Sequence, residues 1–289
     1  DIILDSNGNI VITGSFHTIV DFDPGAGFAN IGSLGQEDIF VLKLDKNGNY
    51  VWANRMGGGS RDEPRSIDIN ASNDIVITGY FEETSDFDPG PNTANLTANG
   101  EEDIFIATLN SLGEYVWAKS IGGTGFDRAQ DLTVDAESNI VVTGYFHNMV
   151  DFDPGNGEQL LSSFGGSEIF ILKLIPSGEL DWVHRFGSVL DDEGHGITTD
   201  QGGNIYATGS FSDKVDFHPT GIYFLEAEDE SDIYTLRLLP QGDFSWAQRA
   251  GGSGFDEGSA IAYSNDAVYV TGTFESIGEF HPGVETVSL

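Results

Sequence analysis

An internal repeat of about 65 residues runs through the sequence and constrains its fold more than any other feature. The segment NIVITGSF, residues 9–16, has four further copies, and its glycine recurs at steps of 65, 65, 65 and 63 residues. The five glycines are Gly14, Gly79, Gly144, Gly209 and Gly272. Self-similarity at a fixed period is typical of solenoids and propellers, in which each unit buries its apolar surface against the next one.

All four tryptophans keep the same step. They stand at Trp52, Trp117, Trp182 and Trp246, so the whole tryptophan content of the chain occupies one repeated position. A catalytic residue is needed once, whereas a packing residue is needed in every unit. The pattern therefore indicates a packing role.

Four runs in each repeat have the features of β-strands, because they are short, rich in β-branched and aromatic residues, and bounded by Gly, Asn and Asp. In the second repeat these runs cover residues 66–70, 74–81, 103–110 and 115–120. Turns such as DSNGN, residues 5–9, supply the Asn and Gly that tolerate positive φ. We therefore predict an all-β chain, a β-propeller of four-stranded antiparallel blades.

The first two strands occur in five copies and the last two in four. The repeats run approximately over residues 1–57, 58–122, 123–187, 188–251 and 252–289, which predicts four full blades and one partial blade. We expect residues 1–289 to be a single β-propeller domain or, preferably, a fragment of a larger one of about six to eight blades. Either the remaining blades of a longer parent chain complete the partial blade, or a partner covers it.

A glycine-rich connector joins each repeat to the next, as in GGTGFD, residues 122–127. Its glycines permit a sharp return of the chain from the outer strand of one blade to the inner strand of the next. Each connector ends in an aspartate, which we expect to accept backbone hydrogen bonds in the turn. These aspartates are Asp62, Asp127, Asp192 and Asp256.

Together these elements resemble the bacterial β-propeller repeat known as the SBBP repeat. Its units combine a Gly-Gly-x-Gly-x-Asp connector, an Asp-x-x-Gly-Asn turn, a Val-Thr-Gly strand and an Asp-x-Phe strand. Here these elements are found at residues 122–127, 135–139, 142–144 and 103–105. The resemblance covers essentially the whole chain. It implies an exported or cell-surface bacterial protein, in which such repeats are often modules of longer chains.

The charge of the chain excludes some partners. It carries 47 Asp and Glu against 12 Lys and Arg, a formal net charge of −35. Phosphate backbones and anionic lipids would be repelled, so we expect no nucleic-acid partner. No stretch approaches the roughly 18 apolar residues of a membrane span, so we expect no direct membrane span. Because there is no cysteine, disulfides and cysteine-ligated zinc are excluded.

The motif Asp-Phe-Asp-Pro-Gly, between the second and third strands, is the most conspicuous candidate site. Residues two apart share one face of an extended chain, so each aspartate pair points one way and its phenylalanine the other. Such pairs could contribute to a Ca²⁺ site, since this ion prefers six to eight oxygen ligands. The candidate ligands are Asp21, Asp23, Asp86, Asp88, Asp151 and Asp153.

A structural turn explains the same motif, and we favour it. Proline presets φ, glycine allows a positive φ, and aspartate bonds the local backbone. In the fourth and fifth copies His218 and His281 replace the second aspartate, and histidine is a poor ligand for Ca²⁺. The phenylalanine persists in every copy, as a packing role requires. These residues are Phe22, Phe87, Phe152, Phe217 and Phe280.

Residues 191–195, Asp-Asp-Glu-Gly-His, form the densest acid and histidine cluster that departs from the repeat consensus. The cluster could bind a cation or serve acid–base chemistry, although a solvated connector is the simpler explanation. The sequence lacks the motifs Gly-x-Ser-x-Gly, His-Glu-x-x-His and Gly-x-x-x-x-Gly-Lys. We therefore assign no catalytic residue.

Near-equivalent repeats favour a non-enzymatic scaffold or binding module, because an enzyme usually needs one asymmetric constellation of residues. We expect a secreted or cell-surface module that presents its loops to a protein or glycan partner, with Ca²⁺ as the candidate cofactor. Two alternatives stay open. One is a propeller hydrolase or lyase that acts on polysaccharides, and the other is a spacer module of a large surface adhesin.

Overall fold

Every regular element of the computed structural model is a β-strand within residues 1–280 and 287–288, which are the residues that the structure describes. The prediction of an all-β chain is confirmed. The chain divides into two compact units, Asp1–Ala129 and Gln130–Leu289, and each is described by itself. Within the described residues, no helix is long and apolar enough to cross a membrane.

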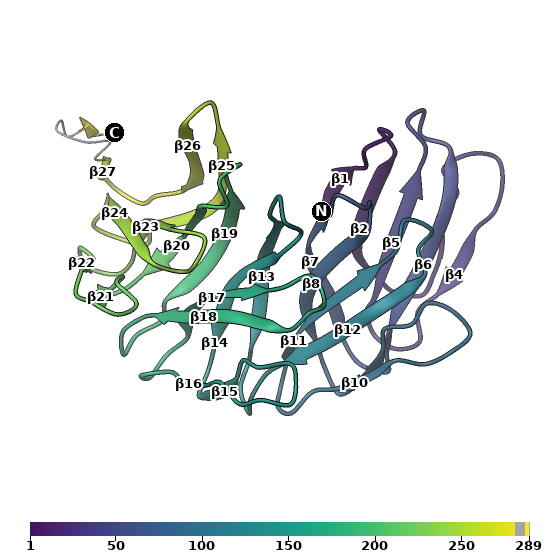
Figure 1. Ribbon diagram of the computed structural model, residues 1–289, viewed down its shortest axis with the longest axis horizontal. Coiled ribbons are helices and arrows are strands. Elements are labelled where there is room, and N and C mark those ends of the chain that lie inside the picture. Colours follow the sequence, from purple (N-terminus) through teal and green to yellow (C-terminus); the bar gives the residue numbers. More distant parts are fainter. Residues whose placement is uncertain (281–286, 289) are drawn as a thin grey trace. The chain divides into compact units, whose positions relative to one another are not determined.

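Unit 1 contains two four-stranded antiparallel sheets that are consistent with propeller blades (Figure 1). Its strands are β1 (Ile2–Leu4), β2 (Ile10–Phe16), β3 (Ile19–Asp21), β4 (Asn30–Gly32), β5 (Asp38–Leu44), β6 (Tyr50–Gly58), β7 (Asp62–Ile69), β8 (Ile75–Phe81), β9 (Thr84–Asp86), β10 (Asn95–Thr97), β11 (Asp103–Leu109) and β12 (Tyr115–Ile121). The two sheets have the orders β1-β2-β5-β6 and β7-β8-β11-β12. The short hairpins β3–β4 and β9–β10 follow the second strand of each repeat, and β9 also pairs with β6.

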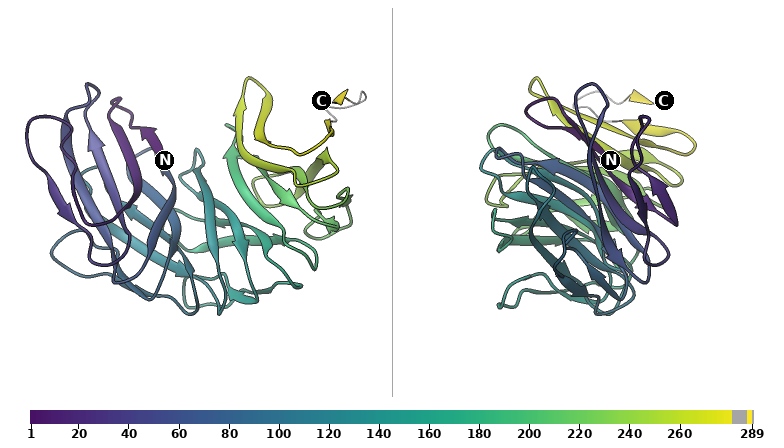
Figure 2. Two further views of the ribbon diagram at one scale, coloured as in Figure 1. Left: turned by 180° about the vertical axis from the view of Figure 1, so that it is seen from behind. Right: turned by 90° about the vertical axis from the view of Figure 1, so that its right-hand side faces the viewer.

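Unit 2 repeats the same plan. The strands of this part of the chain are β13 (Arg128–Val134), β14 (Ile140–Phe146), β15 (Met149–Asp151), β16 (Leu160–Ser162), β17 (Glu168–Leu174), β18 (Leu180–Phe186), β19 (Glu193–Thr199), β20 (Ile205–Phe211), β21 (Lys214–Asp216), β22 (Phe224–Glu226), β23 (Asp232–Leu238), β24 (Phe244–Gly252), β25 (Glu257–Ser264), β26 (Ala267–Thr273), β27 (Gly278–Phe280) and β28 (Val287–Ser288). Two four-stranded sheets, β13-β14-β17-β18 and β19-β20-β23-β24, are followed by the hairpin β25–β26, which lies beside β19 and β20 (Figure 2). The predicted ring, its blade number and the extent of the domain stay predictions.

The strands predicted for the second repeat are present. Strands β8, β11 and β12 match the predicted bounds within one residue. Strand β7 begins four residues earlier than predicted, because the connector residue Asp62 already pairs with Phe81 of β8. The hairpins of three-residue strands beside the Asp-Phe-Asp-Pro-Gly motif were not predicted, since three residues are too few to show a hydrophobic period.

The glycine of the Val-Thr-Gly strand lies opposite a β-bulge. The register of β7 shifts after Pro64, and a Cβ on Gly79 would stand 2.0 Å from the carbonyl oxygen of Glu63. The same 2.0 Å contact with the first strand occurs at Gly209 and Gly272. A side chain at these positions would collide with backbone, so the repeated glycine is a steric requirement of the bulge.

The central strands are buried on both faces, because each sheet packs against the sheet of a neighbouring repeat. Strands β8 and β11 are buried along their whole length. The tryptophans take part in this packing, as predicted. The ring of Trp52 lies against the turn of the next repeat, 3.1 Å from where a Cβ on Gly113 would stand, and Trp182 lies at the same distance from that position on Gly242.

A buried ion pair ties the first turn of a repeat to its third strand. Lys43 Nζ lies 3.0 Å from Asp5 Oδ2 and donates to the carbonyl oxygen of Ser111, in the next repeat, over 3.1 Å. In unit 2 Lys173 Nζ lies 3.1 Å from Asp135 Oδ2. Each lysine therefore satisfies a buried carboxylate, and Lys43 also links two consecutive sheets.

Candidate functional site

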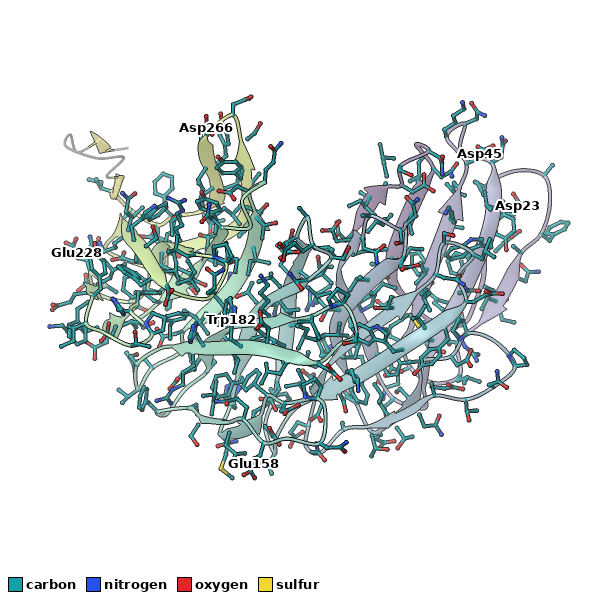
Figure 3. All side chains as sticks on the ribbon, viewed as in Figure 1. Asp23, Asp45, Glu158, Trp182, Glu228 and Asp266 are labelled. Carbon is teal, nitrogen blue, oxygen red and sulfur yellow. The ribbon has the colours of Figure 1, made fainter. Side chains whose placement is uncertain are left out.

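The aspartates of the Asp-Phe-Asp-Pro-Gly motif hold the backbone of the loop between the two short strands. Asp21 Oδ1 accepts hydrogen bonds from the backbone N–H groups of Asp23, over 3.1 Å, and Ala29, over 2.7 Å. Asp23 Oδ1 accepts the N–H of Gly25 over 2.8 Å, and Asp23 lies in the loop between β3 and β4 (Figure 3). The pairs Asp86 and Asp88, and Asp151 and Asp153, make the same bonds at 2.7–3.1 Å.

The fourth copy shows that this role does not require a carboxylate. His218 Nδ1 accepts the N–H of Gly221 over 2.7 Å, in the place of the second aspartate. His281, of the fifth copy, lies outside the described residues. No group of three or more acidic or histidine side chains in the described part of the chain is arranged to hold a metal ion. These loops fit a hydrogen-bonded turn better than a cation cage, and calcium binding stays a prediction.

The phenylalanine of the motif anchors the loop in the core. Phe87 is fully buried, with its ring 5.5 Å from that of Phe81 and 5.0 Å from that of Phe105. Phe152 makes the equivalent contacts with Phe146 and Phe170, at 5.2 and 5.3 Å. The packing role is confirmed for the copies within the described residues whose burial is known, Phe22, Phe87, Phe152 and Phe217.

The connector aspartates are fully buried and close the connector turn, as predicted. Asp62 Oδ2 accepts the N–H of Gly58 over 2.7 Å, and Asp62 Oδ1 accepts the hydroxyl of Ser85 over 2.6 Å. Asp127, Asp192 and Asp256 accept the N–H of the residue four positions earlier at 2.6–2.7 Å. Each connector is therefore a rigid turn on a buried carboxylate.

A second buried acid, which the sequence analysis missed, joins each connector aspartate. A Cβ on Gly251 would stand 2.2 Å from Asp232 Oδ1 and 2.7 Å from Asp256 Oδ2, so only glycine fits between the two carboxylates. The four pairs are Asp38 and Asp62, Asp103 and Asp127, Glu168 and Asp192, and Asp232 and Asp256. The two members stand 24 residues apart in all four repeats, and this constant spacing is the signal that could have revealed them.

These acid pairs hold protons near neutral pH. Burial raises the pKa of the Asp62 carboxyl to about 7, the charge of Asp38 acts in the same direction, and hydrogen bonds from Ser85 and Gly58 oppose it. Burial likewise raises the pKa of Asp192 to about 7 and that of Asp232 to about 6. In three pairs, one buried oxygen has no hydrogen-bond partner. These atoms are Oδ1 of Asp38, Asp103 and Asp232.

One face of each first strand varies between repeats while its buried face is kept. Side chains at Asp62, Pro64 and Ser66 are buried, and those at Arg61 and Glu63 alternate with them and are partly accessible, as expected for a strand. We call the accessible positions before and after each connector aspartate the variable face. It consists of Arg61, Glu63, Arg65, Phe126, Arg128, Gln130, Asp191, Glu193, His195, Phe255, Glu257 and Ser259.

In unit 1 the variable face gathers cations around one aromatic ring. The guanidinium carbons of Arg61, Arg65 and Arg128 lie 5.6, 5.4 and 4.4 Å from the ring centre of Tyr80. The Tyr80 hydroxyl donates to Glu63 over 2.5 Å, and burial with this bond raises the tyrosine pKa to about 12. Three of the twelve cationic residues of the chain therefore meet at one place.

In unit 2 the variable face is acidic, and the structure separates the members of the cluster 191–195. Asp191 is exposed on the connector and Asp192 is buried beneath it. His195 Nε2 lies 3.0 Å from Glu193, and His195 Nδ1 lies 3.0 Å from Glu257 of the following repeat. The histidine therefore bridges two consecutive first strands and does not form one site with Asp191 and Asp192.

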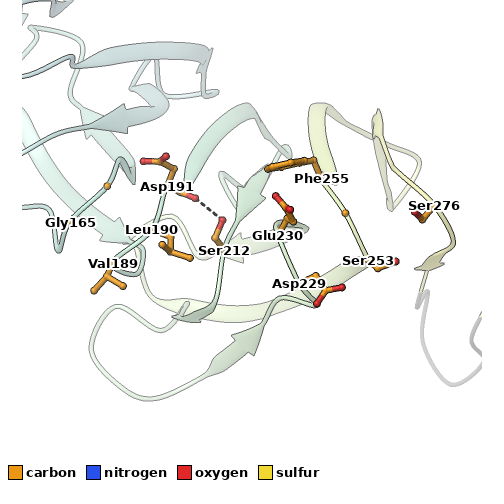
Figure 4. Close-up of a pocket in the computed structure, with 12 residues that line it drawn as sticks. Gly165, Val189, Leu190, Asp191, Ser212, Asp229, Glu230, Ser253, Phe255 and Ser276 are labelled. Atoms are coloured by element: carbon orange, nitrogen blue, oxygen red, sulfur yellow. Dashed lines mark hydrogen bonds between the residues drawn. The ribbon is translucent and has the colours of Figure 1, made fainter.

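A pocket of about 970 Å³ opens beside the variable face of unit 2 (Figure 4). It is lined by two connectors, at residues 189–191 and 253–255, and by the loop that carries Asp229 and Glu230. The hydroxyl of Ser212 donates to the carbonyl oxygen of Asp191 over 3.0 Å and holds one wall in place. No sequence motif marks this pocket, because its lining comes from three consecutive repeats.

Comparisons with known proteins agree with the repeat. Residues 181–210 match the SBBP family, described as a beta-propeller repeat. The chain is 26% identical over 258 residues to an uncharacterized WD repeat-containing protein of Acanthamoeba polyphaga mimivirus. That match covers 76% of this chain and 18% of the relative, so the chain spans less than a fifth of the relative's length.

The crystal structure of a protein of unknown function from Bacteroides caccae is similar to 73% of this chain, over 89% of its own length, with 12% identity and a TM-score of 0.22. A TM-score this low does not establish a common fold. The family assignment depends instead on the match at residues 181–210 and on the recurrence of the same strands in every repeat. On these grounds the chain is a member of the SBBP-like β-propeller-repeat family.

Proposed function

We propose that this chain is a non-enzymatic binding module of a secreted or cell-surface protein, and that its variable face contacts a protein or glycan partner. One observation carries the proposal. The buried positions of the connector and first strand are kept in four repeats, while the accessible positions between them change in size and charge. A rigid scaffold that presents variable side chains is typical of binding modules.

The four-stranded sheets would serve as blades of one ring. Strands β25 and β26 would begin a fifth blade, which the remaining blades of a longer parent chain would complete. Arginine and aromatic side chains, such as Arg65, Phe126 and Phe255, are the types that contribute most to protein interfaces. Phe126 and Phe255 are both exposed, so they are the first residues to test as contacts.

Polysaccharide hydrolysis has less support. Such enzymes need two carboxylates that reach the substrate. The carboxylate pairs at the connectors are fully buried, as in Asp38 with Asp62, and a glycosidic bond could not reach them. An adhesin spacer needs no binding surface at all, so a binding test separates it from the proposed function.

The test is a binding screen of the purified chain against a glycan array and a library of displayed peptides. A ligand from this screen should bind the double variant Phe126→Ala, Phe255→Ala at least ten-fold more weakly. The matched control is Leu112→Ala, an equally exposed apolar residue in the turn between β11 and β12, and it should bind normally. Equal loss in both variants, or no ligand at all, would refute the proposal. Cleavage of a polysaccharide would refute its non-enzymatic part.

A further inference from the structure

We propose that the pocket of unit 2 binds a basic peptide segment, in which an arginine or lysine side chain is flanked by apolar residues. The inference rests on the proposed function and names the partner chemistry for one part of the variable face. It is carried by three features of the pocket, which are its origin in the fold, its charge and its apolar rim.

The pocket opens where the fourth repeat departs from the other three. In those repeats a glycine of the loop before the third strand lies against the connector backbone. A Cβ on Gly35, Gly100 or Gly165 would stand 2.3–2.6 Å from connector main-chain atoms. Asp229 takes this place in the fourth repeat, with a φ of 69° that few residues other than glycine adopt. A side chain does not fit against the connector, so the loop stands away from it and leaves the pocket.

The pocket is acidic and has no cation of its own. Asp191, Asp229 and Glu230 line it, and its lining contains no lysine or arginine. Among the described residues, no ion pair involves Asp229 or Glu230. Asp191 is fixed in place, because its Oδ1 accepts the N–H of Ser167 over 2.9 Å. A guanidinium or ammonium group would supply the missing positive charge, whereas the net charge of −35 repels anions.

The rim of the pocket is apolar. Val189, Leu190 and Phe255 are 63%, 50% and 60% exposed. Exposed apolar groups of this size beside a cavity mark an interaction site more often than isolated surface residues do. The ring of Phe255 can also stack on a guanidinium group. Val189 and Leu190 are aliphatic and offer contacts for aliphatic side chains, so the rim favours a peptide over an amino sugar.

The test uses an end-capped peptide, Gly-Leu-Arg-Leu-Gly, and the same peptide with Gln in place of Arg, in titrations of the whole chain followed by calorimetry. We expect the Arg peptide to bind and the Gln peptide to bind at least ten-fold more weakly. The double variant Asp229→Asn, Glu230→Gln should weaken binding of the Arg peptide at least ten-fold. The control Glu158→Gln, Glu179→Gln removes the same charge from exposed sites outside the pocket and should change binding less than two-fold.

Three results would overturn the inference. They are failure of the Arg peptide to bind, equal weakening by the pocket variant and the control, and tighter binding of a chitosan oligomer with the same dependence on Asp229 and Glu230. The proposed function is judged separately by the screen with Phe126→Ala, Phe255→Ala. A ligand whose binding ignores the pocket variant but depends on Phe126 would refute this inference and leave the binding module standing.

Discussion

Replacing Asp62 by asparagine should protect the chain against the loss of stability that rising pH causes. The carboxyl has a pKa of about 7 in the folded chain and 3.8 as its ordinary value. Between these values the folded chain keeps a proton that the unfolded chain has released, so the free energy of unfolding falls as the pH rises. One such proton changes this free energy by about 1.4 kcal/mol per pH unit. Between pH 5 and 8 the change is on the order of 3 kcal/mol, and most of it is complete at pH 7.

The asparagine variant has no titrating group at this position. Its amide replaces a carboxyl that accepts bonds from Gly58 and Ser85, and any cost of that exchange is the same at every pH. The difference in free energy of unfolding between variant and wild type should therefore move in the variant's favour by on the order of 3 kcal/mol from pH 5 to pH 8.

Urea unfolding at pH 5, 6, 7 and 8, followed by tryptophan fluorescence at constant ionic strength, measures this difference. The matched control is Asp45→Asn, in a turn where hydrogen bonds from Asn49 lower the pKa of the carboxyl. The stabilisation from Asp45 is lost only as the pH falls below about 4, so the control should give a flat difference between pH 5 and 8. A flat difference for Asp62→Asn as well, or one that moves against the variant at high pH, would falsify the assignment of a buried proton to this pair.

Three further outcomes are expected. Lys43→Met should destabilise the chain by about 3–5 kcal/mol in urea unfolding, because it leaves the buried carboxylate of Asp5 without its cation, and Asp5→Asn in the same chain should recover part of the loss. Gly251→Ala should destabilise by about 2 kcal/mol or more, because its φ is 145° and its Cβ would overlap Asp232, whereas Gly59→Ala, with open space around the Cβ, should stay within about 0.5 kcal/mol of the wild type. Thermal unfolding should be the same in millimolar Ca²⁺ and Mg²⁺, and a Ca²⁺-specific rise that Asp151→Asn removes would instead assign the Asp-Phe-Asp-Pro-Gly loops to a calcium site.

Local motifs were the most predictable part of this protein. The Val-Thr-Gly strand, the asparagine- and glycine-rich turns and the Asp-Phe-Asp-Pro-Gly loop are each determined by contacts within one repeat, so the residues of one repeat predict them. The role of Phe152 could be inferred because the phenylalanine persisted while the second aspartate beside it changed to histidine in the fourth copy. The bulge opposite Gly79 could not, because a close approach of two backbones leaves only a glycine in the sequence, and glycine has many other uses.

The sequence by itself determined the repeat period, the all-β class and the residues that turn or pack, because these depend on intervals of a few residues repeated five times. Tertiary structure decided which carboxylates meet and where a pocket opens. Asp38 and Asp62 approach only when the connector folds back over the third strand, and their raised pKa follows from the burial that this fold creates. Asp229 opens a pocket only because the glycine it replaces packs on a connector in the other repeats. Burial and close contact belong to the assembled sheets, and no interval along the chain encodes them.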